Sequence, residues 1–368
     1  MDRNAGILAH AAGGRDSGDL DLLGPGRAAD PSGDAPFTST GHLPPRRTVS
    51  GLLRSAHTTY APLDDGTVAD YIPSLAAADP GRFGISVCGV DGTSFSIGDA
   101  QDAFSLQSIS KAFTFALVCD AIGHTTVRQA VGVNNTGLAF DSVMALELNG
   151  GSPRNPMVNA GALVIISLTP GDSAAAKWQF LQEGMSRFAG RRLPLDAQVY
   201  DSEAATNHRN RALAALLRSY GHMSYDPLLT TDIYTRQCSL LVTARDLAVM
   251  GATLADGGVN PLTHERVVGP SVCRDTLAVM ATSGMYQRSG DWLYEVGLPG
   301  KSGVSGGIVT VAPGKGAMAT YSPRLDATGT SVRGQHATRS LSRSLGLDLF
   351  ASAPEPDAAS PGTPEHAT

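Results

Sequence analysis

Two strand-forming segments lie far apart in this chain, and the residues between them are mostly helical in character. The first, FGISVCGVDGTSFSIGD at 83–99, contains two short β-rich runs around Asp91-Gly92, a typical hairpin turn. The second, at 306–323, reads GGIVTVAP, then a GKG turn, then AMATYSP. The simplest packing joins both segments in one antiparallel sheet with the helical block beside it. We therefore expect an α+β fold.

The expected helices fall into three groups. The helical block covers about 124–284, and its clearest members are 174–189, 203–220, 226–240 and 243–255. A helix at 108–122 precedes the block and is apolar on nearly every side, which is typical of a central buried helix. A last amphipathic helix, at about 331–345, should cover one face of the sheet.

The two ends of the chain differ from this middle. Residues 1–58 are rich in Gly, Ala, Asp, Pro and Arg and show little hydrophobic periodicity, so we expect them to be disordered. The tail at 351–368 has a similar composition. A single folded domain is expected over 59–350, with a helical subdomain at about 124–284.

Composition excludes several classes of function. The net charge of -6 and the scattered basic residues provide no surface for nucleic acid or an anionic membrane. No apolar run is long enough for a membrane span or for the core of a signal peptide. The four cysteines lie far apart, and the nine histidines form no ligand motif, so we expect free thiols, no metal site and a cytoplasmic protein.

The segment FSLQSISKAFTF at 104–115 contains the candidate nucleophile. Lys111 is one of only four lysines among 28 basic residues, and a lysine, unlike an arginine, can lose its proton and act as a base. Residues three apart share a helix face, so Ser108 faces Lys111 whereas Ser110 points elsewhere. Ser105 precedes the helix and has no basic partner at a useful spacing. The competing interpretation makes Ser108 a helix cap and Lys111 a solvated side chain.

A second lysine motif, Lys301-Ser302-Gly303, stands just before a predicted strand. SxxK on a helix followed by K[ST]G on a strand resembles the signature of the serine penicillin-recognising enzymes. Those enzymes usually carry a third motif, Ser-Asp-Asn or Tyr-x-Asn, between these two, and it has no plain counterpart in this chain. In ALELNGG at 145–151, Ala145 falls where a class A β-lactamase needs its glutamate, which disfavours a β-lactamase.

Six ordered motifs resemble the serine-dependent glutaminases over about 60–350: LQSISK, NPMVNAGA, SEAATNHRN, YTRQCS, SGMY and GLPGKSGVSGG. One departure is Gly300, where these enzymes usually have alanine. The resemblance implies a β-lactamase-like fold, with 59–350 as the catalytic domain. It also implies hydrolysis of L-glutamine to L-glutamate and ammonia through an acyl-serine, without a cofactor, by a homodimer or homotetramer.

The resemblance also implies roles for individual residues. It makes Ser108 the nucleophile and Lys111 its base, and it places Tyr234 and Tyr286 at the reaction centre. The backbone N–H groups of Ser108 and Val304 correspond to the oxyanion hole. The residues that grip the amino-acid head are Asn159, Glu203 and Asn210, with Tyr71 and Gln107 as weaker assignments to the pocket wall.

The residues themselves fit a free amino acid as ligand. Its ammonium and carboxylate need a protein carboxylate and several polar donors. Glu203 and Asn210 are seven positions apart, or two helical turns, and on one helix they would share a face. Taken alone, that pair would more often be a solvated helix face. Asn159 lies between apolar stretches, where an unpaired amide is costly to bury, so we expect it to have a partner.

Two other functions remain open from the residues. A carboxypeptidase or β-lactamase of the same fold would be labelled stably by a fluorescent penicillin. A non-catalytic amino-acid sensor would keep the binding pocket, but it would have no use for the activated nucleophile that Ser108, Lys111 and Tyr234 provide. Release of ammonia from glutamine separates the enzyme from both.

Overall fold

A computed structural model describes residues 41–352 of the chain, so the expectations for residues 1–40 and 353–368 lie outside the described residues. One antiparallel sheet of five strands, in the order β2-β1-β7-β6-β5, unites the two strand-forming segments and confirms the expected α+β architecture. Its strands are β1 (Gly84–Gly89), β2 (Ser94–Gly98), β5 (Gly300–Ser302), β6 (Gly307–Ala312) and β7 (Gly316–Tyr321).

The central strands separate two hydrophobic cores. Every residue of β1, β6 and β7 is buried, and successive side chains point to opposite faces of the sheet. In β6, Ile308 and Ala312 pack into the core on one face, whereas Val309 and Val311 pack into the core on the other. The sheet is therefore covered by helices on both sides.

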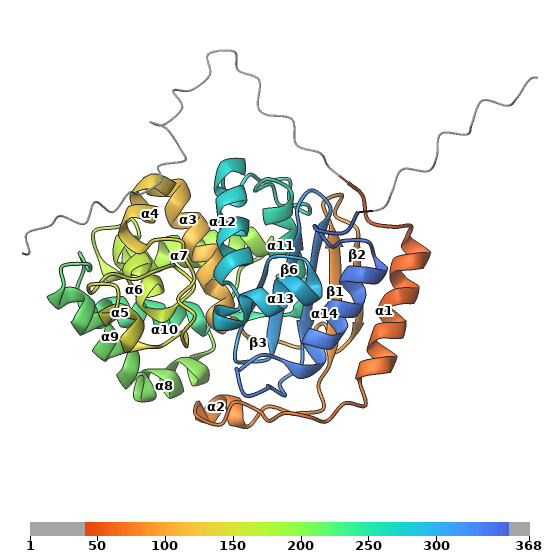
Figure 1. Cartoon of the computed structure of the whole chain (residues 1–368), viewed down its shortest axis with the longest axis horizontal. Coiled ribbons are helices and arrows are strands. Elements are labelled where there is room, and N and C mark those ends of the chain that lie inside the picture. The colour runs from red at the N-terminus through yellow and green to blue at the C-terminus, as the bar shows by residue number, and fades with distance from the viewer. Residues whose placement is uncertain (1–40, 353–368) are drawn as a thin grey trace, which may run out of the picture. The chain divides into compact units, whose positions relative to one another are not determined.

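Different helices cover the two faces (Figure 1). On one face α14 (Val332–Ser344) packs against β6 and β7, and it also contacts α1 (Arg46–Tyr60) and α13 (Ser289–Val296). On the other face α11 (Ala244–Ala255) contacts β1, β6 and β7. A Cβ at Gly251 would lie 2.6 Å from the Ala317 side chain, so the close approach of α11 to the sheet requires glycine there.

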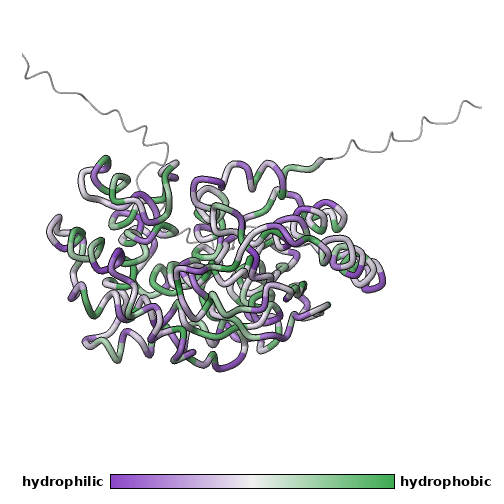
Figure 2. Tube along the Cα trace, turned by 90° about the horizontal axis from the view of Figure 1, so that it is seen from below, coloured by the Kyte–Doolittle hydropathy of each residue, from purple (hydrophilic) through white to green (hydrophobic). Residues whose placement is uncertain are grey.

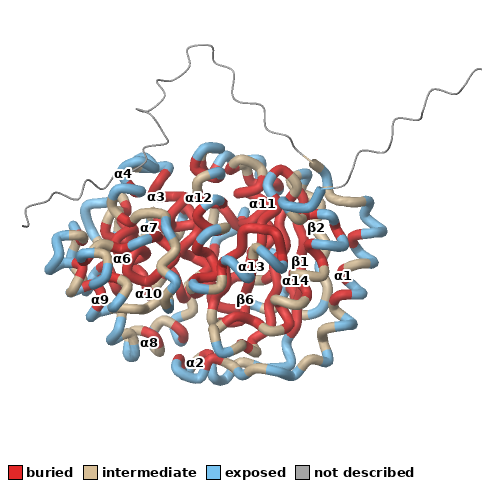
Figure 3. Tube along the Cα trace, in the orientation of Figure 1, coloured by how far each residue is buried: buried red, intermediate tan, exposed pale blue. Residues whose placement is uncertain are grey.

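The remaining helices form the helical part beside the sheet, around α3 (Ser110–Ile122). Every residue from Ser110 to Cys119 is buried, as expected for a central helix, and α3 contacts α4, α6, α7 and α12 (Figure 3). The helices are α4 (His124–Val131), α5 (Val143–Glu147), α6 (Asn159–Leu168), α7 (Ala174–Ala189), α8 (Ala197–Thr206), α9 (His208–Ser219), α10 (Pro227–Cys238) and α12 (Pro270–Ser283).

Short elements lie between these two parts. The strands β3 (Phe104–Ser105) and β4 (Leu241–Val242) form a two-stranded sheet, and α2 (Pro73–Ala76) precedes β1. The 3₁₀ turns η1 (Gln107–Ile109) and η2 (Tyr286–Arg288) lead into α3 and α13.

Two expected helices have different limits. The helix expected from residue 108 begins with η1 and becomes α-helical only at Ser110. The single helix expected at 203–220 is wrong, because the chain breaks at Asn207 into α8 and α9. The Asn207 side chain donates a hydrogen bond to Thr235 Oγ1 at 3.0 Å instead of continuing the helix face.

We expected residues 1–58 to be disordered, and this expectation is wrong for residues 46–58. Residues 46–60 form α1, which buries Val49, Leu53 and Ala56 against the core that also contains Ala337 and Leu341 of α14. These three residues recur at helical spacing in a segment that otherwise consists mostly of polar and small residues. Figure 2 shows hydrophobic and hydrophilic residues interspersed along the described part of the chain.

None of the helices in the described range 41–352 combines the length and the apolar character that crossing a membrane requires.

Replacement of Leu53 by alanine tests whether α1 is part of the folded domain. The Leu53 side chain is only 2 % exposed. Leu53→Ala should therefore lower the free energy of unfolding by about 2–4 kcal/mol in chemical denaturation. Arg54→Ala, on the exposed side of the same helix, should leave it nearly unchanged. Equal stability of the two variants would contradict the packing of α1.

Candidate active site

The turn η1 presents Ser108 between β3 and α3. Ser108 is half-buried, whereas its neighbours Gln107 and Ile109 are buried. Lys111, one turn further along, donates a hydrogen bond from Nζ to Ser108 Oγ at 3.1 Å. The structure thus brings together the two residues that the SxxK motif singles out.

The neighbouring serines have other partners. Ser110 is fully buried, and its hydroxyl donates to the Gln107 carbonyl at 2.6 Å. Ser105 accepts a hydrogen bond from Gln107 Nε2 at 3.1 Å. Neither hydroxyl is hydrogen-bonded to Lys111, so Ser108 is the serine paired with a base.

The amine of Lys111 is buried without a carboxylate partner. Its side chain is 1 % exposed, and within residues 41–352 no Asp or Glu forms an ion pair with it. The rings of Phe140, Tyr234 and Tyr286 surround Nζ, with centroids 5.4 to 5.9 Å away. Burial lowers the pKa of Lys111 from 10.5 to about 8, against a smaller opposing effect of Cys238. A neutral amine, able to accept a proton, is therefore accessible near neutral pH.

Two asparagines from different helices continue this network. Asn159, the first residue of α6, accepts hydrogen bonds at Oδ1 from Lys111 Nζ at 2.6 Å and from the Tyr234 hydroxyl at 3.4 Å. Its Nδ2 donates to Asn210 Oδ1 at 2.9 Å. The Asn159 oxygen thus accepts two hydrogen bonds, while among residues 41–352 its nitrogen donates only to Asn210 and keeps a second N–H for a ligand.

Glu203 supplies a buried carboxylate. It is 9 % exposed, and Gln107 Nε2 donates to its Oε1 at 2.5 Å. Burial raises the pKa of Glu203 from 4.5 to about 7, although the Gln107 hydrogen bond opposes the rise. No Lys, Arg or His of residues 41–352 forms an ion pair with Glu203. A cationic ligand would relieve the cost of burying this charge.

Glu203 and Asn210 do not share a helix face, contrary to the prediction from their spacing. The break at Asn207 places Glu203 on α8 and Asn210 on α9. Glu203 accepts a hydrogen bond from Gln107, whereas Asn210 accepts one from Asn159.

Tyr286 and Lys301 occupy the other side of Ser108. The centroid of the Tyr286 ring lies 5.4 Å from Lys111 Nζ, and burial raises the pKa of this phenol well above its usual range, against a smaller opposing effect of Ser108. Lys301 Nζ lies 3.9 Å from the centroid of the Tyr286 ring, and its own hydrogen bond goes to the Ser302 carbonyl. Burial and then the proximity of Lys111 lower the pKa of Lys301 well below 10.5. The second lysine motif therefore contributes to the same cluster.

Two residues of the cluster have left-handed backbones. Gln107 has φ 51° and Tyr286 has φ 56°, and neither is a glycine. Such a conformation costs on the order of 1–3 kcal/mol and persists only where the surrounding contacts fix it. The backbone strain is therefore located at Gln107, immediately before Ser108, and at Tyr286.

The turn at Val304 lies against η1. A Cβ at Gly303 would be 3.1 Å from the Leu106 carbonyl oxygen and 3.2 Å from Gln107 Cβ, so the two turns are in close contact. Hydrogen bonds of the turn use the N–H groups of Gly303 and Gly306. Within the described residues the Val304 N–H donates to no acceptor, and it remains available to a ligand.

One residue of the cluster carries no sequence signal. Phe140 packs at a tilt on Tyr286 with centroids 5.0 Å apart, yet it belongs to a loop without any motif. Tyr71, expected in the pocket wall, lies just before α2 and is 58 % exposed as a whole residue, but burial and then the Glu203 carboxylate raise the pKa of its phenol to about 12, so the phenol faces the site. Among residues 41–352, no group of three His, Cys, Asp or Glu is placed to hold a metal ion.

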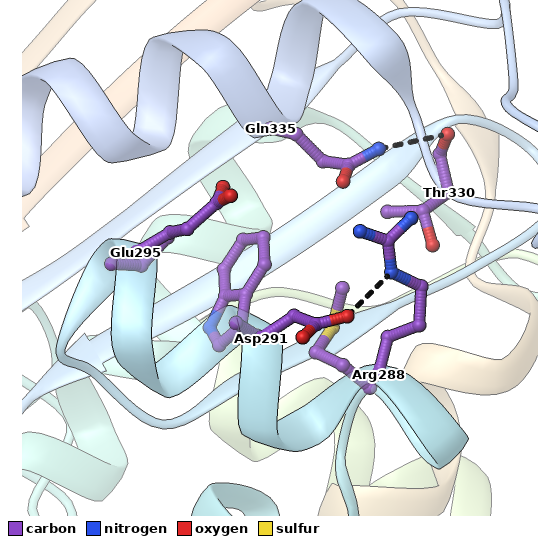
Figure 4. Close-up of a pocket in the computed structure, with 8 residues that line it drawn as sticks. Arg288, Asp291, Glu295, Thr330 and Gln335 are labelled. Atoms are coloured by element: carbon purple, nitrogen blue, oxygen red, sulfur yellow. Dashed lines mark hydrogen bonds and ion pairs between the residues drawn. The ribbon is translucent and has the colours of Figure 1, made fainter.

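A separate pocket lies behind η2, between α13 and α14 (Figure 4). Its polar groups bind one another: Arg288 pairs with Asp291 at 3.3 Å, and Gln335 donates to the Thr330 carbonyl at 3.4 Å. It contains none of the predicted site residues. The cluster around Ser108 is therefore the candidate active site.

Comparisons with known proteins agree on one family. The family model described as Glutaminase matches residues 66–350. The chain is 53 % identical over 318 residues to "Glutaminase 2" of Yersinia pestis, covering 86 % of this chain and 94 % of that protein. It is 52 % identical over 285 residues to a glutaminase of Brucella canis, covering 77 % and 90 % respectively.

Solved structures give the same result. The structure of the probable glutaminase ybaS is similar with a TM-score of 0.83 and 43 % identity, covering 84 % of this chain and all of that one. The structure of Mglu in its glutamate form has a TM-score of 0.80 and 41 % identity, and covers 84 % of this chain and 72 % of that one.

The burial of Lys111 predicts a characteristic dependence of stability on pH. Below about pH 8 the amine is charged in both states, so the burial penalty is fully present. Between pH 8 and 10.5 only the unfolded chain keeps the proton, so stability rises with pH. Relative to Lys111→Met, the wild-type protein should gain about 3 kcal/mol of unfolding free energy across this range in denaturant titrations. A difference that does not vary with pH would contradict a lowered pKa.

Proposed function

This chain belongs to the glutaminase family and hydrolyses L-glutamine to L-glutamate and ammonia, and from that premise we propose that Ser108 and Lys111 perform the reaction through an acyl-serine intermediate. The observation that carries this assignment is the 3.1 Å hydrogen bond between Lys111 Nζ and Ser108 Oγ, formed by a buried amine without a carboxylate partner. These groups supply a base and a nucleophile without a metal or cofactor.

In the first half-reaction, neutral Lys111 takes the hydroxyl proton of Ser108 while Oγ attacks the side-chain amide carbon of glutamine. The oxygen that becomes negative lies between the N–H groups of Ser108 and Val304. The C–N bond then breaks as the nitrogen receives the proton from Lys111, and the phenol of Tyr286, whose ring lies beside Lys111 Nζ, assists this transfer. Ammonia leaves, and the glutamyl group stays on Oγ as an ester.

In the second half-reaction a water molecule replaces ammonia. Lys111 takes a proton from the water while its oxygen adds to the ester carbon. The Ser108 oxygen then leaves and recovers the proton from Lys111. Glutamate is released and the free enzyme is restored, so the same base serves both halves.

The head of the amino acid is held by the polar residues around this centre. Glu203 pairs with the α-ammonium, because it is a buried carboxylate that lacks a cation in the described part of the chain. The amide nitrogens of Asn159 and Asn210 donate to the α-carboxylate. The Asn210 nitrogen has no hydrogen bond among residues 41–352, which leaves it free for that role. The Tyr234 hydroxyl donates to Asn159 Oδ1 and so helps to orient this amide.

Location and assembly complete the proposal. The four cysteines are all free and buried, which suits the reducing cytoplasm. As in the family that it resembles, we propose that the protein forms a homodimer or homotetramer, and that glutamine is its partner rather than nucleic acid or a membrane. Sedimentation at several protein concentrations distinguishes the two assemblies from a monomer.

Replacement of single serines tests the nucleophile. Ser108→Ala should abolish ammonia release from glutamine while leaving the fold intact, because among residues 41–352 no other hydroxyl is hydrogen-bonded to Lys111. Ser110→Ala removes a hydroxyl bonded to the Gln107 carbonyl and should keep kcat within about tenfold of wild type. An active Ser108→Ala together with an inactive Ser110→Ala would refute the assignment. Glutamine binding without turnover by the wild-type protein would instead indicate a sensor.

Substrate length tests the position of Glu203. Asparagine is one methylene shorter, so with its head on Glu203 its amide carbon stops about 1 Å short of Ser108, which lowers kcat/KM roughly a hundredfold. Glu203→Gln should raise KM for glutamine about 10- to 100-fold with little change in kcat, because it removes the charged partner of the ammonium. Equal efficiency on asparagine, or an unchanged KM in the variant, would place the ammonium elsewhere.

A further inference from the structure

The turn that carries Tyr286 is held by a side chain from another part of the chain. Asn135 lies in the loop between α4 and α5, far from Tyr286 in sequence. Its Nδ2 donates to the Tyr286 carbonyl at 2.9 Å and to the Thr282 carbonyl, near the end of α12, at 2.7 Å. One amide group therefore bridges the two ends of the segment 283–285.

The orientation of this amide is itself fixed. Asn135 Oδ1 accepts a hydrogen bond from the Gly137 N–H at 2.7 Å, so the side chain is anchored to its own loop. Both hydrogens of the amide nitrogen point at main-chain carbonyls. An asparagine with three such bonds is a rigid link between the loop and the turn rather than a mobile surface group.

The same loop also contacts the Tyr286 side chain. Phe140 packs on the Tyr286 ring with centroids 5.0 Å apart, so the loop fixes both the main chain and the ring of this residue. Within the turn, Ser289 Oγ donates to the same carbonyl at 2.8 Å. The pocket of Figure 4 is lined by Met285 and Arg288 of the same turn, and among residues 41–352 no side chain that lines it donates to the Tyr286 carbonyl. Asn135 is thus the polar link that comes from outside the turn.

We propose that Asn135 is a positioning residue for glutamine hydrolysis. Its amide holds the Tyr286 backbone in the left-handed conformation, with φ 56°, that keeps the ring centroid 5.4 Å from Lys111 Nζ. Left-handed backbone at a residue with a bulky side chain needs such external support. The inference rests on the proposed function, because Asn135 acts on the reaction only through Tyr286.

Asn135→Asp is the sharpest test. The aspartate has nearly the same size, but it lacks the N–H donors and sets negative oxygen atoms against two carbonyls. Because a displacement of about 1 Å costs up to a hundredfold in rate, we expect kcat for glutamine to fall 10- to 100-fold. KM should stay within about twofold, since Glu203 and Asn210 are untouched. Asn135→Ala, which removes the donors without adding repulsion, should lose less, about three- to tenfold.

Thr136→Val is the matched control. The Thr136 hydroxyl donates to the Leu138 carbonyl at 3.2 Å and accepts from the Leu138 N–H at 3.0 Å, so its hydrogen bonds stay within the loop. This variant should keep wild-type kcat, although it loosens the loop locally. Circular dichroism and thermal unfolding show whether each variant is folded; if Asn135→Asp fails to fold, the alanine variant decides.

Three results would overturn the proposal: a kcat of Asn135→Asp within twofold of wild type, an equal loss of kcat in Thr136→Val, or a rise in KM at unchanged kcat. None of these would affect the proposed nucleophile, whose failure shows independently as ammonia release by Ser108→Ala.

Discussion

The structure around the reaction centre depends on one buried amine. Lys111 lies on a helix that is buried along most of its length, and no carboxylate of residues 41–352 pairs with it. A charged amine in that position is costly, so the surroundings favour the neutral form. The groups that contact it are an amide oxygen, a hydroxyl and aromatic rings, which all tolerate an uncharged amine. The same burial that costs stability lowers the pKa of Lys111 to about 8, so that this amine can act as a base.

Enclosing this amine requires both parts of the fold. The helical part supplies α3, α6 and α10, with Lys111, Asn159 and Tyr234 respectively. The part built on the sheet supplies η2, with Tyr286, and β5, with Lys301. Burial lowers the pKa of Lys301 well below 10.5, and the nearby Lys111 lowers it further. A site of this kind cannot be built on either part alone.

Backbone strain is concentrated at the same place. Gln107 immediately precedes Ser108 and Tyr286 lies beside Lys111, and a hydrogen bond from another side chain holds each of these left-handed residues. The Ser110 hydroxyl binds the Gln107 carbonyl, and the Asn135 amide binds the Tyr286 carbonyl. Rigid positioning of reacting groups is the general benefit of such an arrangement.

The sequence by itself determined the strands β1, β2, β6 and β7, most of the helices and the pairing of Ser108 with Lys111, because these follow from periodicity and from spacing within one helical turn. It did not indicate β3 or β4, and it placed Lys301 just before a strand, whereas Lys301 lies within β5. It failed at α1, where a short apolar stripe is hidden in a segment of disorder-like composition, and at Asn207, which separates Glu203 from Asn210. Only the tertiary structure decided that Phe140 and Asn135 reach Tyr286 and that Gln107 binds Glu203. The physical reason is that contacts between distant residues depend on the paths of loops and the breaks between helices, and no local pattern of residues records these.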